Sequence, residues 1–377
     1  MDVLRLAQSV ETKLPWLRAN LRDLVQIESP SENPDAVNAA MEFAASLALS
    51  IGGRVKIHRQ KLHGNVYELR FGPQKSTRKP HLLLGHLDTV WPLGTLATMP
   101  WHETANTLHG PGVLDMKAGV LMALTAISAL KTNGINRPIT LLLNSEEEIG
   151  SPVSRPITER LALASSAVFV LEPAQGLAYK TARKGVGHYK LHVTGVGSHS
   201  GVDFSRGHSA IRELARLVET VSNFTDPARQ LTVNVGVFQG GTRSNIVPAE
   251  AHAEVDVRIA RASDAAHVDR LFRRLRPTDP ACKLTITGGI NRPPMERKAG
   301  TIALYKQART LAAQLGFQLD EAATGGGSDG NFTAALNIPT LDGMGAIGEG
   351  AHAAHEHILT QHLIPRTTLL AAMLGTT

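Results

Sequence analysis

Acidic side chains and a histidine follow several short apolar runs of this chain, at positions where strands would end. The run "HLLLG" is followed by His86 and Asp88, and the run "AVFVL" by Glu172. The run "ITLLLNS" is followed by three successive glutamates, Glu146, Glu147 and Glu148. Because open α/β sheets bind ligands beyond the carboxyl ends of their strands, we expect these side chains to meet in one crevice.

Several carboxylates in one crevice indicate that a cation binds there. Crowded carboxylates raise one another's pKa unless positive charge neutralises them. Asp115, in "GPGVLDMKAG" before an apolar helical segment, adds a further carboxylate. Each acid taken alone is more simply a helix cap or an exposed loop charge, since surface acids are the norm. For a set that follows successive buried strands, a divalent metal site is the better interpretation.

The elements that must position these residues favour an α/β fold class. The runs "NVYELRF", "HLLLGH", "ITLLLN" and "AVFVLE" are apolar, and helical patterns lie between the later ones, which predicts a mostly parallel sheet flanked by helices. The segment Ala118–Leu130 predicts a buried helix and is too short for a bilayer, which needs roughly 20 residues. Residues 3–27 have apolar positions at helical spacing, with a break at Pro15.

The pattern of elements changes near Lys184. From there to Ile290 the sequence predicts a strand, a helix, two strands, a helix and a strand, which is the order of a ferredoxin-like α+β unit. We therefore expect a small domain inserted over residues 184–290. Residues 1–183 and 291–377 would together form the larger α/β domain.

Composition narrows the classes of function. The formal net charge is +6, but the basic residues are scattered and aromatic residues make up only 4%, so we expect no nucleic-acid partner. The single cysteine, Cys282, cannot form an intramolecular disulfide and fits a reducing compartment. Asp2 and Arg5 interrupt the first apolar residues, so no secretory signal is visible. We expect a cytoplasmic protein without a membrane partner.

A set of short motifs runs in one order from Gly85 to His352 and a little beyond. The motifs are "GHLDTV", "GPGVLDMKAG", "SEEEIGS", "LEPA", "GSHSG", "SNIVP", "TGGGSDG" and "GAHAAHEHI". Together they resemble the co-catalytic zinc hydrolases that include bacterial glutamate carboxypeptidase, acetylornithine deacetylase, succinyl-diaminopimelate desuccinylase, aminoacylase and carnosinase. The resemblance covers nearly the whole chain. It is closest to the glutamate carboxypeptidase branch, through "NRPP" and "TGGGSDG".

The resemblance implies two Zn²⁺ ions per chain, with Co²⁺ or Mn²⁺ as possible substitutes. Asp115 matches the carboxylate that bridges the two ions. His86 and Glu172 would complete the ligands of one ion, and Glu148 and His352 those of the other. Each ion would then have three protein ligands and share a water, the open arrangement that catalytic zinc needs.

Within these motifs, the position of each residue relative to the family's pattern determines which role the resemblance implies for it. In "EEIGS" the glutamate before the isoleucine, Glu148, falls on the metal ligand, and Glu147 falls on the general base. Asp88 would orient the ring of His86 through the nitrogen that does not bind metal. In the family an acidic residue follows the histidine ligand by four positions, and Glu356 follows His352 at this spacing, so His352 is the preferred ligand. Two further histidines of this segment are treated as bystanders, His355 and His357.

Other matched residues would bind the substrate. Arg292, in "NRPP", offers a planar fork for a carboxylate, and Gly326 and Gly327 offer bare main-chain amides. The resemblance implies that residues 1–183 and 291–377 form the catalytic, zinc-binding domain and that the inserted domain, residues 184–290, is a lid and dimerisation domain. In the family, a histidine and an asparagine of the lid, here His199 and Asn245, act on the oxyanion of the transition state. In dimeric relatives the partner subunit supplies the histidine. We therefore expect the lid to close over the metal site, and a homodimer to form through it.

The function that these residues imply is hydrolysis of an amide bond next to a free carboxylate in a small molecule or short peptide. A carboxypeptidase that releases a C-terminal amino acid such as glutamate is the main hypothesis. The alternative is an N-acyl amino acid deacylase of the acetylornithine or succinyl-diaminopimelate type. More remote hypotheses are a serine hydrolase, in which "GGSDG" supplies Ser328 ahead of Asp342 and His352, and a binding protein without catalysis.

Overall fold

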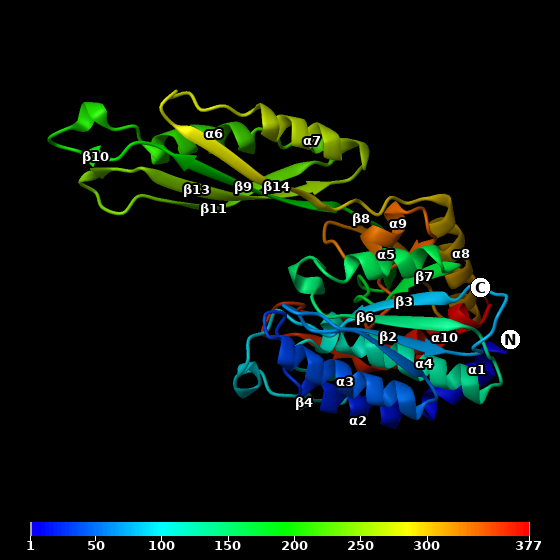
Figure 1. Cartoon of the computed structure of the whole chain (residues 1–377). Helices are drawn as coiled ribbons and strands as arrows, with labels where there is room; N and C mark the ends of the chain where they lie inside the picture. The colour runs from blue at the N-terminus through cyan, green and yellow to red at the C-terminus, as the bar shows by residue number, and fades with distance from the viewer. Residues whose placement is uncertain (1, 377) are drawn as a thin grey trace. The chain divides into compact units, whose positions relative to one another are not determined.

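The computed structural model describes residues 2–376, which form two compact units (Figure 1). The first unit comprises the chain up to Ala182, the segment Arg297–Ala323 and the chain from Ser328 onwards. The second unit comprises Arg183–Glu296 and the short loop Thr324–Gly327. It therefore extends past the boundary expected at residue 290, and it includes the arginine and the glycines expected to bind substrate.

A six-stranded sheet forms the centre of the first unit. Its strands, in spatial order, are β1 (Arg54–His58), β2 (Val66–Phe71), β6 (Ile139–Asn144), β3 (His81–His86), β7 (Ala167–Val170) and β16 (Thr340–Leu341). Strands β6, β3, β7 and β16 run parallel, whereas β1 and β2 add an antiparallel edge. The predicted α/β class with a mostly parallel sheet is confirmed.

Helices cover both faces of this sheet. They are α1 (Val3–Glu11), α2 (Leu14–Val25), α3 (Pro34–Ser50), α4 (Ala118–Thr132), α5 (Arg155–Leu163), α8 (Ala299–Gln314), α9 (Gly330–Ala335) and α10 (Leu363–Thr376). Side chains alternate along β3: Leu83 joins the core of α1–α4, α8 and α10, while Leu82 and Leu84 join a smaller core beside α5. Figure 1 shows α5 and the group of α1–α4 on opposite faces of the sheet.

Two helix predictions are confirmed. Helix α4 is the buried helix predicted for Ala118–Leu130. By length and composition the segment Val113–Thr132 could span a membrane, but 89% of its most apolar window is buried inside the structure, as in a core helix. The N-terminal pattern is broken as predicted, because α1 ends at Glu11 and α2 begins at Leu14, which leaves Pro15 in the first turn of α2.

A second, small sheet lies in the first unit and has no counterpart in the sequence predictions. Its strands are β17 (Gly348–Glu349), β18 (His357–Leu359), β5 (Thr107–His109) and β4 (His102–Glu103), all antiparallel. Strand β5 leads into the loop that contains Asp115, and β18 follows the loop that contains His352. This sheet therefore joins two loops that contain expected metal ligands.

The second unit has the predicted ferredoxin-like order of elements. They are β9 (Gly185–Thr194), α6 (Ala210–Ser222), β11 (Thr232–Gly240), β13 (Glu250–Ile259), α7 (Ser263–Arg274) and β14 (Lys283–Arg292). The strands form an antiparallel sheet of order β11-β13-β9-β14. Alternate residues of β9 and β13 are buried, and Tyr189 stacks on Phe272 of α7 with ring centroids 3.8 Å apart. A short pair, β10 (Ser198–His199) and β12 (Ile246–Val247), lies beside this fold.

Candidate active site

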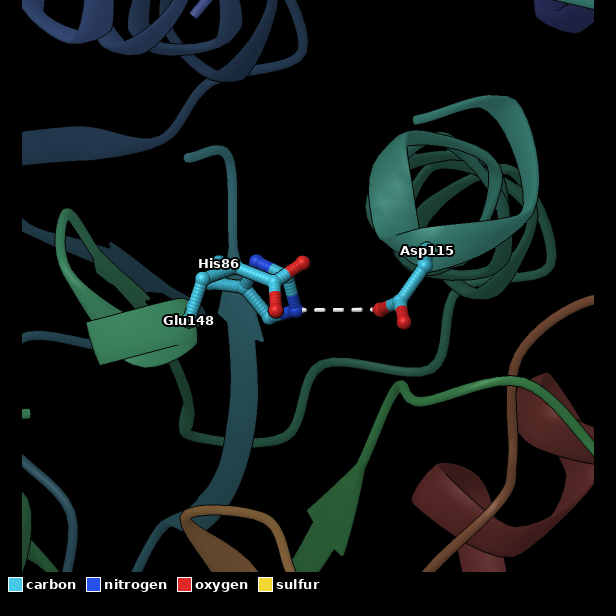
Figure 2. Close-up of side chains that lie close together, drawn as sticks. All are labelled: His86, Asp115 and Glu148. Carbon is cyan, nitrogen blue, oxygen red and sulfur yellow. Dashed lines mark hydrogen bonds and ion pairs between the residues drawn. The ribbon is translucent and has the colours of Figure 1, made fainter. Parts of the chain in front are cut away.

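His86 stands at the end of β3 and is almost completely buried. Its Nε2 atom lies 3.2 Å from Oδ1 of Asp115 (Figure 2). The same atom lies 3.7 Å from Oε1 of Glu172. Its Nδ1 atom lies 3.0 Å from the main-chain oxygen of Asp88 and 3.4 Å from the carboxylate of that residue. The ring is therefore held on one side and presents its other nitrogen to two carboxylates.

Asp115 contacts two histidines through different oxygens. Its Oδ1 atom faces His86, and its Oδ2 atom lies 3.4 Å from Nε2 of His352. The same Nε2 atom of His352 lies 3.2 Å from Oε1 of Glu148. The carboxylate of Asp115 thus lies between His86 and His352, the two histidines that the resemblance assigns to different metal ions.

The three successive glutamates adopt different positions because β6 ends at Asn144, before the run begins. Glu146 is fully buried, and its carboxylate accepts hydrogen bonds from the Ser145 hydroxyl and from main-chain N–H groups of Ser145, Val153 and Ser154. Glu147 and Glu148 begin a 3-10 turn, Glu147–Ile149. Glu146 is therefore a structural residue, and the next two glutamates approach the cluster.

Asp88 positions this turn. Its carboxylate accepts hydrogen bonds from the main-chain N–H groups of Glu147 and Glu148, each at 3.1 Å. The Ser31 hydroxyl donates a further hydrogen bond to the same carboxylate at 2.7 Å. Asp88 therefore connects the end of β3 to the turn after β6, in addition to contacting His86.

The donor atoms of this cluster suit a divalent metal. Within each of two groups, one ligand atom per residue lies within 4.8 Å of the others: His86, Asp115 and Glu148, and His86, Glu147 and Glu172. The first group puts Glu148 beside His86, whereas the resemblance assigns Glu148 to the second ion with His352. Because Asp115 contacts both histidines, all the donors belong to one continuous cluster. Imidazole nitrogens and carboxylate oxygens are the ligands that zinc accepts.

Electrostatics also favour a cation here. Burial lowers the pKa of His86, but hydrogen bonds to Asp115 and Asp88 outweigh burial and raise that pKa well above its usual value. Hydrogen bonds to Asp115 and Glu148 raise the pKa of His352 to about 10. Burial, together with the charges of Asp115 and Asp88, raises the pKa of Glu148 although His352 opposes this. Carboxylates dominate the cluster, so positive charge stabilises it.

Glu356 is completely buried and accepts hydrogen bonds from the loop that contains Asp115. Its Oε1 atom accepts hydrogen bonds from the main-chain N–H groups of Leu114 at 2.8 Å and Asp115 at 3.1 Å. Its Oε2 atom accepts from the N–H of Gly112 at 3.0 Å and from the Trp91 indole at 2.9 Å. In the sequence, Glu356 serves only to distinguish His352 from the neighbouring histidines, and its structural role is not predicted.

The C-terminal histidines His352 and His357 have different surroundings. His352 reaches the cluster, and half of its side chain is exposed. His357 instead contacts the main-chain oxygen of His355 and stacks on His109 of the small sheet. His352 is thus the histidine of this segment that contacts Asp115.

The serine hydrolase hypothesis is contradicted by the geometry. Ser328 is fully buried and donates a hydrogen bond to Oδ2 of Asp342 at 2.6 Å. A catalytic triad would need a histidine between these two residues. His352 contacts Asp115 and Glu148 instead. The catalytic serine of such hydrolases follows a buried strand, whereas β15 (Asp320–Thr324), the strand before Ser328, contains no buried residue.

The expected substrate-binding residues fall within the second unit. His199 is exposed on β10 and pairs with Ile246, and the N–H of Ser200 donates to the main-chain oxygen of Asn245 at 3.0 Å. His199 and Asn245 are therefore neighbours in this unit.

Arg292 is also in the second unit, where it ends β14 and is 5% exposed. A Cβ added at Gly327 would lie 3.0 Å from Cδ of Arg292, so this glycine permits a close approach. Arg183 donates hydrogen bonds to the main-chain oxygens of Gly326 and Gly327. No motif in the sequence indicates that Arg183 holds this loop.

The fold and the cluster agree with comparisons to known proteins. The model of peptidase family M20/M25/M40 matches residues 82–376. The chain belongs to this family.

The similarity to several known proteins extends over almost the whole chain. Carboxypeptidase G2 of Pseudomonas sp. (strain RS-16) is 29% identical over 98% of this chain and 91% of its own length. Among solved structures, aminopeptidase PepT of Bacillus cereus matches with a TM-score of 0.76 and 21% identity, over 96% of this chain and 98% of its own. An M20 family metallo-carboxypeptidase of Sulfolobus solfataricus matches with a TM-score of 0.75 and 18% identity, over 95% and 98%. The protein is therefore a carboxypeptidase-like hydrolase of a metallopeptidase family, and membership of that family implies use of a divalent metal.

Proposed function

We propose that the protein is a di-zinc carboxypeptidase that releases a C-terminal amino acid, such as glutamate, from a short peptide or an acyl conjugate. The observation that carries this proposal is the cluster in which Asp115 contacts both His86 and His352 while Glu147 and Glu148 approach it. Similarity to Carboxypeptidase G2 over nearly the whole chain supports it.

The proposed ligands form two sets that share Asp115. His86 and Glu172 would hold one zinc ion, and Glu148 and His352 the other, with Co²⁺ or Mn²⁺ as substitutes. Three protein donors for each ion leave room for water, as catalytic zinc requires. When bound, the ions would polarise the scissile carbonyl and lower the pKa of a water.

Glu147 and Asp88 would control the transfer of a proton from the attacking water to the leaving amine. Glu147, held by the hydrogen bond from its main-chain N–H to Asp88, takes a proton from the attacking water and passes it to the leaving amine as the amide C–N bond breaks. Asp88 keeps His86 in one orientation through the nitrogen that faces away from Asp115. Glu147 is therefore the proposed general base, and Asp88 a positioning residue.

The second unit would supply substrate recognition. Arg292 would pair with the substrate carboxylate, and the amides of Gly326 and Gly327 would approach it. His199 and Asn245 would donate to the oxyanion that develops in the transition state. In this proposal the second unit serves as a lid.

N-acyl amino acid deacylation is the alternative, because the same amide chemistry and carboxylate recognition would serve it. A panel of substrates separates the two. Turnover of peptidyl- or folyl-glutamates well above that of N-acetyl and N-succinyl amino acids is the result expected for the carboxypeptidase. The reverse order would establish the deacylase, and turnover of neither class would refute the proposed function.

We also propose that the protein is a cytoplasmic homodimer that associates through the second unit. Strand β11 is an edge strand of its sheet, and Phe238 on that strand is 42% exposed. An unpaired edge with an exposed aromatic side chain can join a second copy, although edges are often simply protected. Sedimentation velocity of the full chain tests this, and a monomer at assay concentrations would refute it.

A further inference from the structure

Three histidines and a glutamate form one row across the small sheet. Within the registered pairs, Glu349 faces His357, His357 faces His109, and His109 faces His102. Directly opposed residues of antiparallel strands project from the same face, with their Cβ atoms about 4.5–5.5 Å apart. The row therefore has one member on each of β17, β18, β5 and β4.

The rings of the three histidines lie beside one another. The ring centroids of His109 and His357 are 5.0 Å apart and nearly parallel, at 28°. Those of His102 and His109 are 5.6 Å apart. His102 is exposed, and the other two are half-buried. Three imidazoles are thus accessible to an ion from solvent.

The hydrogen bonds of His357 and His109 bear on which ring nitrogen keeps a lone pair that can bind a metal ion. Nδ1 of His357 lies 2.9 Å from the main-chain oxygen of His355, so it carries the proton and leaves Nε2 with a lone pair. Nε2 of His109 lies 2.8 Å from the Thr107 hydroxyl oxygen, and when Nε2 donates this hydrogen bond, Nδ1 keeps the lone pair that a metal needs. Burial, with the charges of His357 and His102, lowers the pKa of His109, and neutral imidazole is the form that binds metal.

We propose that His102, His109 and His357 form an auxiliary site for a divalent transition-metal ion, separate from the His86 cluster. Imidazole suits zinc, nickel and copper ions. His109, in the middle of the row, would be the central ligand, and the carboxylate of Glu349 adds negative charge at one end. Among residues 2–376, three ligand atoms lie within 4.8 Å of one another only in the His86 cluster, so at least one ring of the row must turn for all three to bind one ion. His102 is exposed, and exposed side chains change rotamer within picoseconds to nanoseconds.

Calorimetric titration of Ni²⁺ into the full-length protein, previously saturated with Zn²⁺ and dialysed, tests this site without reference to activity. The wild-type chain should bind a further Ni²⁺ ion. His109→Gln should weaken this binding about ten-fold or more, which corresponds to 1.4 kcal/mol for each factor of ten, and His357→Gln should do the same. The matched control is His188→Gln, which replaces an exposed strand histidine of the second unit and should leave the binding unchanged.

Thermal unfolding of each variant shows whether it is folded, and His102→Gln on the outer strand β4 serves as a third variant that disturbs the fold least. Equal Ni²⁺ affinity in the wild-type chain and in folded His102, His109 and His357 variants would overturn the proposal. The absence of any Ni²⁺ binding by the wild-type chain would also overturn it. Neither outcome bears on the proposed peptidase activity, because the row shares no ligand with the His86 cluster.

Discussion

The carboxylate of Glu356 accepts a hydrogen bond from the main-chain N–H of Asp115 at 3.1 Å, across 241 positions of sequence. The same carboxylate accepts hydrogen bonds from two other N–H groups of the Asp115 loop, at Gly112 and Leu114. Glu356 lies four residues after His352. Its buried side chain therefore connects the loop that contains His352 to the loop that contains Asp115, and these two residues contact each other. The geometry of the cluster depends on this tie.

Glu356→Gln should therefore weaken the metal site of a protein that remains folded. The amide NH₂ group of glutamine would face N–H donors, which costs about 1–3 kcal/mol for a buried group left unsatisfied. We expect lower metal affinity and lower kcat, with KM nearly unchanged, because Glu356 does not touch the substrate. Metal affinity and steady-state kinetics measured below the unfolding temperature check this. Wild-type metal affinity and kcat would show that Glu356 supports only the fold.

Glu147 and Glu146 allow a matched comparison of neighbours with different roles. Glu147→Gln should retain metal and stability but lower kcat by about 10²–10⁴-fold, the usual contribution of a general base. Glu146→Gln should lower the unfolding temperature, since its carboxylate accepts hydrogen bonds from buried N–H groups. Substantial turnover by folded, metal-loaded Glu147→Gln would exclude Glu147 as the base.

Arg292→Ala should raise KM for a substrate with a free carboxylate by about ten- to a hundred-fold, the equivalent of one or two charge-assisted hydrogen bonds. Arg292→Lys is the control that keeps the charge while removing the planar fork, and it should give an intermediate KM. Kinetics on a free acid and on its amidated analogue provide the measurement. If wild-type enzyme cleaves the amidated analogue equally fast, recognition of the carboxylate is excluded.

His199→Ala should lower kcat by about 10²–10³-fold, as expected for loss of one oxyanion donor, while zinc content stays normal. Loss of zinc would instead place His199 among the ligands. Mixing His199→Ala chains with Glu147→Gln chains tests sharing between subunits, because an intact lid of one chain could then serve the intact cluster of the other. Near-normal kcat of His199→Ala alone would refute its role.

Local patterns in the sequence indicated the parallel strands and helix α4 because each is a clear apolar run, and the ferredoxin-like unit because its strands and helices are long enough to be recognised. The small sheet was not predicted, since its strands are only two or three residues long. Arg292 fell in the larger domain because the inserted domain was expected to end at residue 290, whereas β14 continues to Arg292. The buried role of Glu356 depends on a contact between distant segments that no local pattern reveals.

The most direct test of the central claim is the metal content of purified protein after dialysis against metal-free buffer, which also removes ions held weakly at the surface. The proposed cluster predicts close to two zinc ions per chain, loss of amide hydrolysis on chelation and recovery on adding Zn²⁺. His86→Ala should lose bound zinc, whereas Ser328→Ala should keep zinc and activity. Hydrolysis that resists chelation in protein without any transition metal would contradict the account.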